Sequence, residues 1–469
     1  MKLGLLVLVA TCAVCSTAFA RGGGGLKTAK TARRGAHSLG MQAATTALGK
    51  RGGDATIASS TFNLAKSIVG AGVLSLPSGI AFFADSPSAI VPASIMCAAM
   101  GLVSAYTFSM IGRVCEKTNA TSFQDAWAKT VSPKTAWTMS ASITAMCFLA
   151  SLAYSIIIGD SFTSLAKSFN LPALLSQRTN VIILMTTLVL YPLCSLKSLN
   201  ALSPFSLLGL GGTLYTALFM AIRYFDGSYA VKGKFFTQLA PALQPSFNKR
   251  GGFSVNHLTF VLISMLSTSY IAHYNAPRFY NELKDTSMPR FNKVVTLAFG
   301  ASIATFILMM NLGFLTFGGV TSGFVLNNYA GSDPLASLAR LAIGMALLTG
   351  YPFTFSALRD GILDLRNATG AEREKQIRPL TLTLITAITA LALLLKDVGY
   401  VVSLSGALFG SVLMFVVPAL MNISMQHGSS TSTTGNKLEI VGNYAMVATG
   451  IVMGALGVAI STLREMGKL

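Results

Sequence analysis

Long apolar segments recur along almost the whole chain, and they constrain the fold more than any other feature. We count eleven of them, separated by short polar segments, at 61–84, 88–112, 137–159, 179–196, 202–224, 257–277, 292–317, 335–358, 379–395, 398–424 and 437–462. Each is close to the roughly 20 residues that a helix needs to cross a bilayer. The ten-residue alternating segments of a membrane β-barrel are absent from the sequence. We therefore expect an all-α polytopic membrane protein with 11 transmembrane helices, in a domain at 56–465.

The composition agrees with lipid contact and argues against a water-soluble enzyme. Of 469 residues, 52% are hydrophobic and only 11% are charged, whereas about 25% of a typical soluble domain is charged. The four histidines form no zinc-protease motif, and no nucleophile motif is present. A channel would need polar faces along several spans, but polarity is concentrated in the middle of two. We expect no enzyme, no metal and no cofactor.

The positive charge is concentrated at the amino terminus. The net charge is +19, and residues 1–53 contain eight Lys and Arg and no acidic residue. A basic face with interleaved aromatic residues, which nucleic-acid binding would require, does not appear. Two glycine pairs, Gly406-x3-Gly410 and Gly450-x3-Gly454, predict close packing between helices instead of a ligand site. The expected partner is the lipid bilayer, with no nucleic acid.

The first 55 residues have the composition of targeting segments. Residues 1–20 resemble a signal peptide, since their apolar run is too short to span a bilayer. Residues 21–55 form a basic tail, disordered or like a transit peptide. Together they resemble the bipartite presequence of proteins sent to plastids with extra membranes, so we expect a plastid envelope or another endomembrane. The alternative is an uncleaved first helix with a disordered arm.

The distribution of loop charges bears on orientation. Fifteen Lys and Arg residues lie in loops on the side of the tail and ten on the opposite side, which favours a cytosolic position for the tail. This conflicts with a cleaved signal peptide, which would draw the new amino terminus across the first membrane.

The first apolar segment is interrupted at mid-depth. Gly70 and Gly72 lie in its centre, and Pro77 follows. Glycine lets the backbone leave the helix, and proline suits the first turn of a new helix because it lacks an amide donor. Unwound backbone in a membrane is tolerated only where it lines a protected cavity. We expect substrate contacts from Ile68, Gly70, Ala71 and Gly72.

The sixth segment has a corresponding interruption. Ser264, Ser267, Thr268, Ser269, Tyr270, His273, Tyr274 and Asn275 crowd its middle, and Pro277 follows. Segments one and six are equivalent members of the two halves in a 5+5 inverted-repeat transporter fold, whose discontinuous helices bind solutes at mid-membrane. We expect further substrate contacts from Ser267, Ser269, Tyr270 and His273. His273 is open to two interpretations, a proton relay or a hydrogen bond to a neighbouring helix.

Several motifs resemble the amino acid/auxin permease family, close to its neutral amino acid and vacuolar amino acid transporters. They are Phe62-Asn63-Leu64, Ile68 to Leu74, Leu76-Pro77, Pro277-x2-Tyr280-x-Glu282, Leu315 to Gly318, Tyr351-Pro352, Gly406-Ala407 and Pro418-Ala419-Leu420. The resemblance covers about residues 60–462. It implies secondary active transport of amino acids by alternating access, with neutral amino acids as the expected substrates. An amino acid sensor on the same fold, without net transport, stays open as the alternative.

One departure from the family concerns the coupling ion. Sodium-coupled members have an asparagine where this chain has Lys66, and a hydroxyl residue near the helix-eight proline where Thr349 alone could serve. A lysine ammonium could replace sodium, since both supply one positive charge to the same carbonyl oxygens. We expect H⁺ coupling or uncoupled transport in preference to Na⁺, although Lys66 could instead extend to the membrane surface. For the width of the pocket, we expect Tyr154, Tyr351 and Phe409 to contribute.

Overall fold

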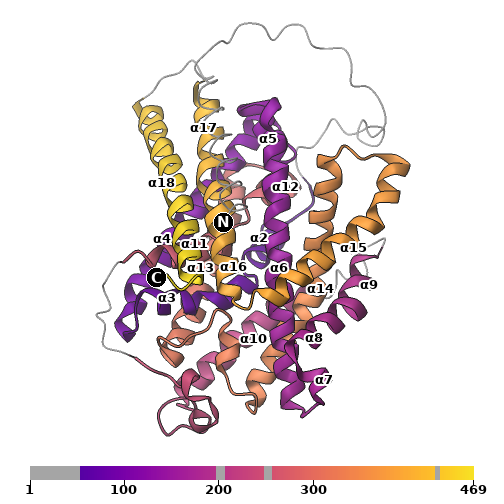
Figure 1. The fold of residues 1–469 in the computed structure, drawn as a ribbon. Coiled ribbons are helices and arrows are strands. Elements are labelled where there is room, and N and C mark those ends of the chain that lie inside the picture. Colours follow the sequence, from indigo (N-terminus) through magenta and orange to yellow (C-terminus); the bar gives the residue numbers. More distant parts are fainter. Residues whose placement is uncertain (1–52, 197–205, 248–255, 428–433, 469) are drawn as a thin grey trace.

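The structure, a computed structural model, describes residues 53–196, 206–247, 256–427 and 434–468 (Figure 1). The signal-like segment 1–20 and all but the last residues of the basic tail lie outside them. Over the described residues the chain is almost entirely helical, and its only β-type pairings are two isolated bridges, Ala55 with Leu283 and Ser246 with Gly318. The all-α class is confirmed.

Each of the eleven apolar segments contains a helix or a broken helix. In chain order the segments hold α2 (Ile57–Ile68) with η1 (Ala71–Ser75) and α3 (Leu76–Phe83); α4 (Ile90–Thr118); α6 (Trp137–Ser168); α8 (Arg178–Met185) with η4 (Thr186–Leu190) and α9 (Tyr191–Cys194); α10 (Ser206–Phe225); α11 (Thr259–Ser269) with η8 (His273–Asn275) and α12 (Ala276–Glu282); α13 (Met288–Phe317); α14 (Pro334–Leu365); α15 (Gly370–Leu394); α16 (Val398–Ser405) with η10 (Gly406–Gly410), η11 (Val412–Val416) and α17 (Val417–His427); and α18 (Thr434–Glu465). The connections carry shorter helices, α5 (Phe123–Thr130), α7 (Ala173–Ser176) and η9 (Val325–Asn328) among them.

Not every helix of the described residues is long and apolar enough to cross a membrane by itself. In the described part of the chain, seven helices are long and apolar enough to span a bilayer, and the bent pair at the first segment could make an eighth. Eleven crossings therefore stay a prediction. Several helices run past the predicted segments, α14 to Leu365 and α15 from Gly370, because a helix's backbone hydrogen bonds continue where its side chains turn polar.

Segments one and six are both broken, as expected. The two halves of segment one, Ile57–Ile68 and Gly72–Phe83, are bent by 42°. In segment six α11 ends at Ser269 and α12 begins at Ala276. Pro77 and Pro277 each lie in the first turn of the second half-helix, the position where a missing amide donor costs least. The discontinuous helices of the predicted transporter fold are confirmed.

The glycine pairs bring helices close together, as predicted. A Cβ at Gly410 would lie 2.9 Å from the Cβ of Ser267 in α11, and one at Gly450 would lie 2.8 Å from Val416. At Gly406 a side chain would overlap the carbonyl oxygen of Ser264. These contacts pack α11 and α18 against the π-helical turns η10 and η11.

A buried ion pair joins α10 to the start of α14. Asp333 is 0% exposed and caps α14. It accepts hydrogen bonds from Arg223 Nη2 at 2.7 Å, Arg223 Nε at 2.9 Å and the Tyr229 hydroxyl at 2.9 Å. Burial, reinforced by this carboxylate, raises the pKa of the Tyr229 phenol. Loss of one partner of such a pair costs about 3–5 kcal/mol, so the pair strongly restrains this end of the two helices.

Replacement of Gly406 by alanine tests the close packing. The methyl group would overlap the Ser264 carbonyl oxygen, and overpacking of this kind lowers the free energy of unfolding by about 1–3 kcal/mol. Gly442, in α18, is the matched control, because its Cβ position meets no atom within 4 Å. We expect Gly406→Ala to lower the Tm in detergent and Gly442→Ala to leave it unchanged or raise it. Equal effects would contradict the packing account.

Candidate functional site

A cavity of about 140 Å³ lies where the two broken segments meet. Segment one contributes Ser67, Ile68, Gly70 and Gly72, and segment six contributes Thr268, Ser269, Ile271 and Tyr274. The two breaks are in contact, since a Cβ at Gly72 would lie 3.3 Å from Ser269 Oγ. The cavity is therefore a consequence of both helices losing their regular geometry at the same depth.

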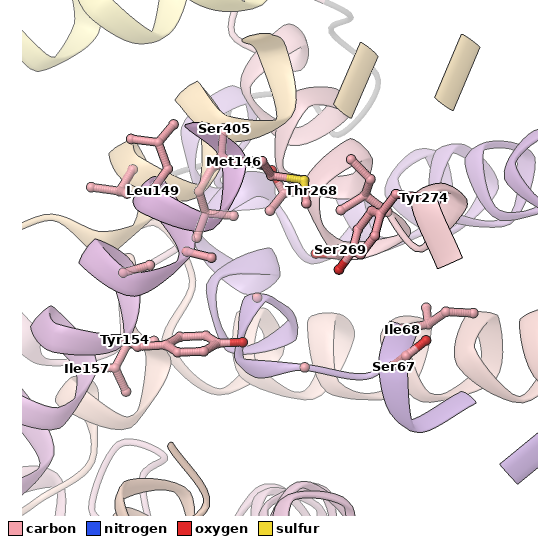
Figure 2. A pocket seen from close by; sticks show the side chains of 17 residues that line it. Ser67, Ile68, Met146, Leu149, Tyr154, Ile157, Thr268, Ser269, Tyr274 and Ser405 are labelled. Atoms are coloured by element: carbon pink, nitrogen blue, oxygen red, sulfur yellow. Dashed lines mark hydrogen bonds between the residues drawn. The ribbon is translucent and has the colours of Figure 1, made fainter. Parts of the chain in front are cut away.

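Two further helices complete the wall. α6 contributes Met146, Leu149, Ala150, Ala153, Tyr154 and Ile157, and α16 contributes Val401, Val402 and Ser405. In Figure 2 the rings of Tyr154 and Tyr274 project into the same space from different helices, with Ser67 and Ile68 nearby. The lining is thus mostly apolar, with hydroxyl groups at a few positions.

At the first break the regular backbone hydrogen bonding stops. The last α-type bond of α2 runs from Val69 N–H to Ala65 O at 2.8 Å. The next bonds, from Gly70 N–H to Ile68 O at 2.9 Å and from Val73 N–H to Gly70 O at 3.3 Å, span only two and three residues. The carboxyl end of α2, with its partial negative charge, therefore faces the cavity beside the start of η1.

Three hydroxyl groups of the lining act as acceptors toward the cavity. Ser67 Oγ donates to Leu64 O at 3.0 Å, Thr268 Oγ1 donates to Val402 O at 2.6 Å, and Ser269 Oγ donates to Met265 O at 2.9 Å. Their hydrogens are committed to backbone carbonyls, so their oxygens are left to accept bonds. None of the lining residues carries a formal charge. A bound solute would meet dipoles, not a fixed ion.

Tyr270 and His273 were predicted to contact substrate, but the structure places them outside the lining, against α4. The Tyr270 hydroxyl donates to Cys97 O at 3.1 Å. His273 Nε2 lies 2.9 Å from Thr107 Oγ1 and 3.2 Å from Ser104 O. Both side chains are 0% exposed. They hold the unwound segment to α4. Of the two interpretations of His273, the structure shows the hydrogen bond to a neighbouring helix.

Ser267 and Thr349 also lie outside the lining. Ser267 is 1% exposed, donates to Ile263 O at 3.0 Å and packs against Gly410, because the periodicity of α11 points it toward η10. Thr349 Oγ1 donates to Met345 O at 3.1 Å and Ala346 O at 3.0 Å within its own helix. Lys66 lies in the last turn of α2 and is half-buried, next to the lining residue Ser67.

The sequence identified part of the wall and missed the rest. Ile68, Gly70, Gly72, Ser269 and Tyr154 line the cavity, and Ala71 lies in η1 between two of them. Their contact with substrate stays a prediction. Tyr351 is buried and accepts a bond from Ser155 Oγ at 3.2 Å, and Phe409 is buried within η10, so neither contributes to the wall. The α16 residues Val401, Val402 and Ser405 were missed. The one signal in the sequence was the pair Gly406-x3-Gly410, which predicts close packing of this segment but not its partner.

Comparison with known proteins identifies the family. Residues 53–463 match the family described as transmembrane amino acid transporter protein. The chain belongs to this family. A Danio rerio protein whose name places it among the sodium-coupled neutral amino acid transporters is 23% identical over 414 residues, 87% of this chain and 88% of that protein. Vacuolar amino acid transporter 2 of Saccharomyces cerevisiae is 25% identical over 380 residues, 77% of this chain and 75% of that protein.

A solved structure shares the fold. The crystal structure of MhsT in complex with L-phenylalanine aligns with a TM-score of 0.52 and 12% identity, covering 87% of this chain and 100% of that one. At this identity the likeness shows the fold alone. This multi-pass membrane protein therefore belongs to a family of transporters and is not an enzyme. The composition had already argued against a water-soluble enzyme.

Tyr270→Phe tests the attachment of the sixth segment to α4. The variant keeps the ring and removes the hydroxyl that donates to Cys97 O, so we expect the free energy of unfolding to fall by about 1 kcal/mol. Tyr191→Phe is the control, because Tyr191 is 37% exposed and should tolerate the change. Thermal denaturation in detergent measures both variants. A Tm for Tyr270→Phe equal to that of the parent would show that the hydrogen bond does not hold the segment.

Proposed function

We propose that this chain transports small neutral amino acids across its membrane by alternating access, with the cavity between the two helix breaks as the binding site. The observation that carries the proposal is the character of this cavity. It is small, it lies between two interrupted helices, and its lining contains hydroxyl groups and backbone but no charged side chain.

The electrostatics suit a zwitterion. The carboxyl ends of α2 and α11 carry partial negative charge at the cavity, beside the acceptor oxygens of Ser67, Thr268 and Ser269. An ammonium group fits there. The backbone around Gly70 and Gly72 starts the next helical turn, whose amide groups carry partial positive charge suited to a carboxylate. A side chain with its own formal charge would find no partner in this lining, and burying an unpaired charge is costly.

The size of the cavity favours a small side chain. An engineered protein cavity of about 150 Å³ accommodates benzene, a molecule of about six non-hydrogen atoms. Alanine has the same number of non-hydrogen atoms, and the cavity here is about 140 Å³. Met146, Leu149 and Val402 form an apolar wall that suits an aliphatic side chain.

For the coupling ion, the structure supports the sequence-based hypothesis of transport without sodium. Lys66 is in the last turn of α2, where a cation is favoured by the partial negative charge of the helix end. Thr349, the residue expected to complete a sodium site, lies outside the lining of the cavity. We propose that Lys66 supplies the positive charge that a bound sodium ion supplies elsewhere, with proton coupling or uncoupled transport as the consequence.

For the location, we propose an endomembrane. The relatives include proteins named as vacuolar amino acid transporters, and the plastid envelope stays the more specific hypothesis from the sequence of the tail.

Uptake into proteoliposomes tests transport, coupling and the sensor alternative together. We expect alanine or serine to accumulate, lysine and glutamate to be excluded, and removal of the sodium gradient to have no effect. A strict requirement for sodium would contradict the role of Lys66. Specific binding of alanine without any flux would favour the sensor.

Ser405→Asp tests why the substrate must be neutral. The variant places a carboxylate in the cavity wall, which would attract a cationic side chain and disfavour neutral substrates. We expect alanine uptake to fall at least about tenfold, equivalent to about 1.4 kcal/mol, and lysine competition to appear. Ser405→Asn has nearly the same shape without the charge and should keep the parent preference. If lysine competes with alanine uptake equally well in both variants, charge in the cavity does not set the specificity.

A further inference from the structure

Four hydroxyl side chains lie in the second half of α11, and one of them bonds to another helix. Ser264, Ser267 and Ser269 donate to carbonyl oxygens of their own helix, at 2.7 Å, 3.0 Å and 2.9 Å, the usual bond for a hydroxyl in a helix. Thr268 Oγ1 donates to Val402 O of α16 at 2.6 Å, and Ser264 O, the acceptor within its own helix, lies at 3.5 Å. The Thr268 hydroxyl therefore joins the sixth segment to the tenth.

Glycine at position 406 makes this bond possible. α16 ends there, and the Gly406 N–H bonds to Val402 O as well as to Ser403 O. A carbonyl oxygen has two lone pairs, so Val402 O can accept the Thr268 hydroxyl too. A Cβ at Gly406 would overlap the Ser264 carbonyl and would lie 2.6 Å from Thr268 Oγ1. The hydroxyl reaches its acceptor through space that any side chain at position 406 would fill.

The bond lies at the cavity wall. Thr268 lines the cavity from α11, and Val402 lines it from α16, next to Val401 and Ser405. Val402 thus supplies both the acceptor carbonyl and part of the apolar wall. Because these two lining residues are bonded to each other, a change in the spacing of α11 and α16 changes the width of the cavity directly.

We propose that Thr268 sets the upper size limit of the substrate. It acts as a positioning residue, since its bond to Val402 O holds α16 against α11 and keeps the cavity at about 140 Å³. This volume has room for alanine or serine but not for leucine, which is larger than alanine by an isopropyl group. The inference rests on the function proposed above, because the size limit applies to the same site.

Competition measures the size limit. In the full-length chain, unlabelled alanine or leucine displaces labelled alanine, in uptake or in binding, and the ratio of the half-maximal concentrations of leucine and alanine is recorded. In the parent chain we expect a ratio of at least about 10, since apolar pockets discriminate by this factor for a single methylene. Thr268→Val keeps the shape of the side chain and loses the donor. We expect it to lower the ratio about threefold, the effect of one hydrogen bond.

The ratio separates cavity width from recognition of the ammonium group. Alanine and leucine carry the same ammonium group, so loss of the Thr268 oxygen as an acceptor would weaken both equally and leave the ratio unchanged. Thr216→Val is the matched control, because Thr216 is 0% exposed, lies in α10 and donates to Gly212 O of its own helix at 2.7 Å. It should keep the parent ratio. Gly406→Ala, which crowds the same contact from the other helix, should also lower the ratio and covers the case in which Thr268→Val does not fold.

A measurement without substrate keeps the size limit separate from the proposed function. In the Ser405→Cys chain the new thiol lines the cavity, and the four described cysteines are buried. The rate of labelling by benzyl methanethiosulfonate, divided by the rate for methyl methanethiosulfonate, reports the width of the cavity. We expect Thr268→Val to raise this quotient about threefold, and Thr216→Val to leave it unchanged.

Several results would overturn the inference. One is leucine as effective as alanine in the parent chain, and another is an unchanged ratio or quotient in Thr268→Val. Equal effects of Thr216→Val and Thr268→Val would also overturn it, because they would mean general loosening of the helices. If the quotient rises in Thr268→Val but no amino acid is transported or bound, the proposed function fails alone, and Thr268 still sets the width of the cavity.

Discussion

Peptide groups cannot be left without hydrogen bonds inside a bilayer, and the rest of this structure follows from how the chain meets that constraint. Two helices are interrupted at the same depth, at Gly70 and at Tyr270. Each break exposes backbone dipoles that lipid could not satisfy. The breaks therefore face each other across a protected cavity, and α6 and α16 cover it. In the proposed function, substrate binding uses the same peptide groups that the fold had to shield.

The second break is held in place by hydrogen bonds to α4. Tyr270 and His273 bond to α4 through Cys97 O, Ser104 O and Thr107, while Ile271 and Tyr274 face the cavity. Residues of the unwound segment thus divide into those that fix the backbone and those that face the cavity. This division lets a chain with very few charges inside its helices keep an irregular segment in one position.

Much of the fold could be predicted from the sequence, and the site only in part. Apolar segments of spanning length locate the helices, and Gly70, Gly72, Pro77 and Pro277 locate the breaks, because these residues act through local backbone chemistry. The direction of side chains beyond a break could not be predicted, since helical periodicity ends there. For that reason Tyr270 and His273 were assigned to the cavity, and Ser405 of α16, distant in sequence, was not.

The central claim is that the two broken helices hold both charged ends of one small amino acid. The most direct measurement is an experimental structure of the full chain with bound alanine. We predict density for the ammonium group at the carboxyl ends of α2 and α11, and for the carboxylate beside Gly70 and Gly72. Continuous helices at segments one and six, or alanine bound away from both, would contradict the account.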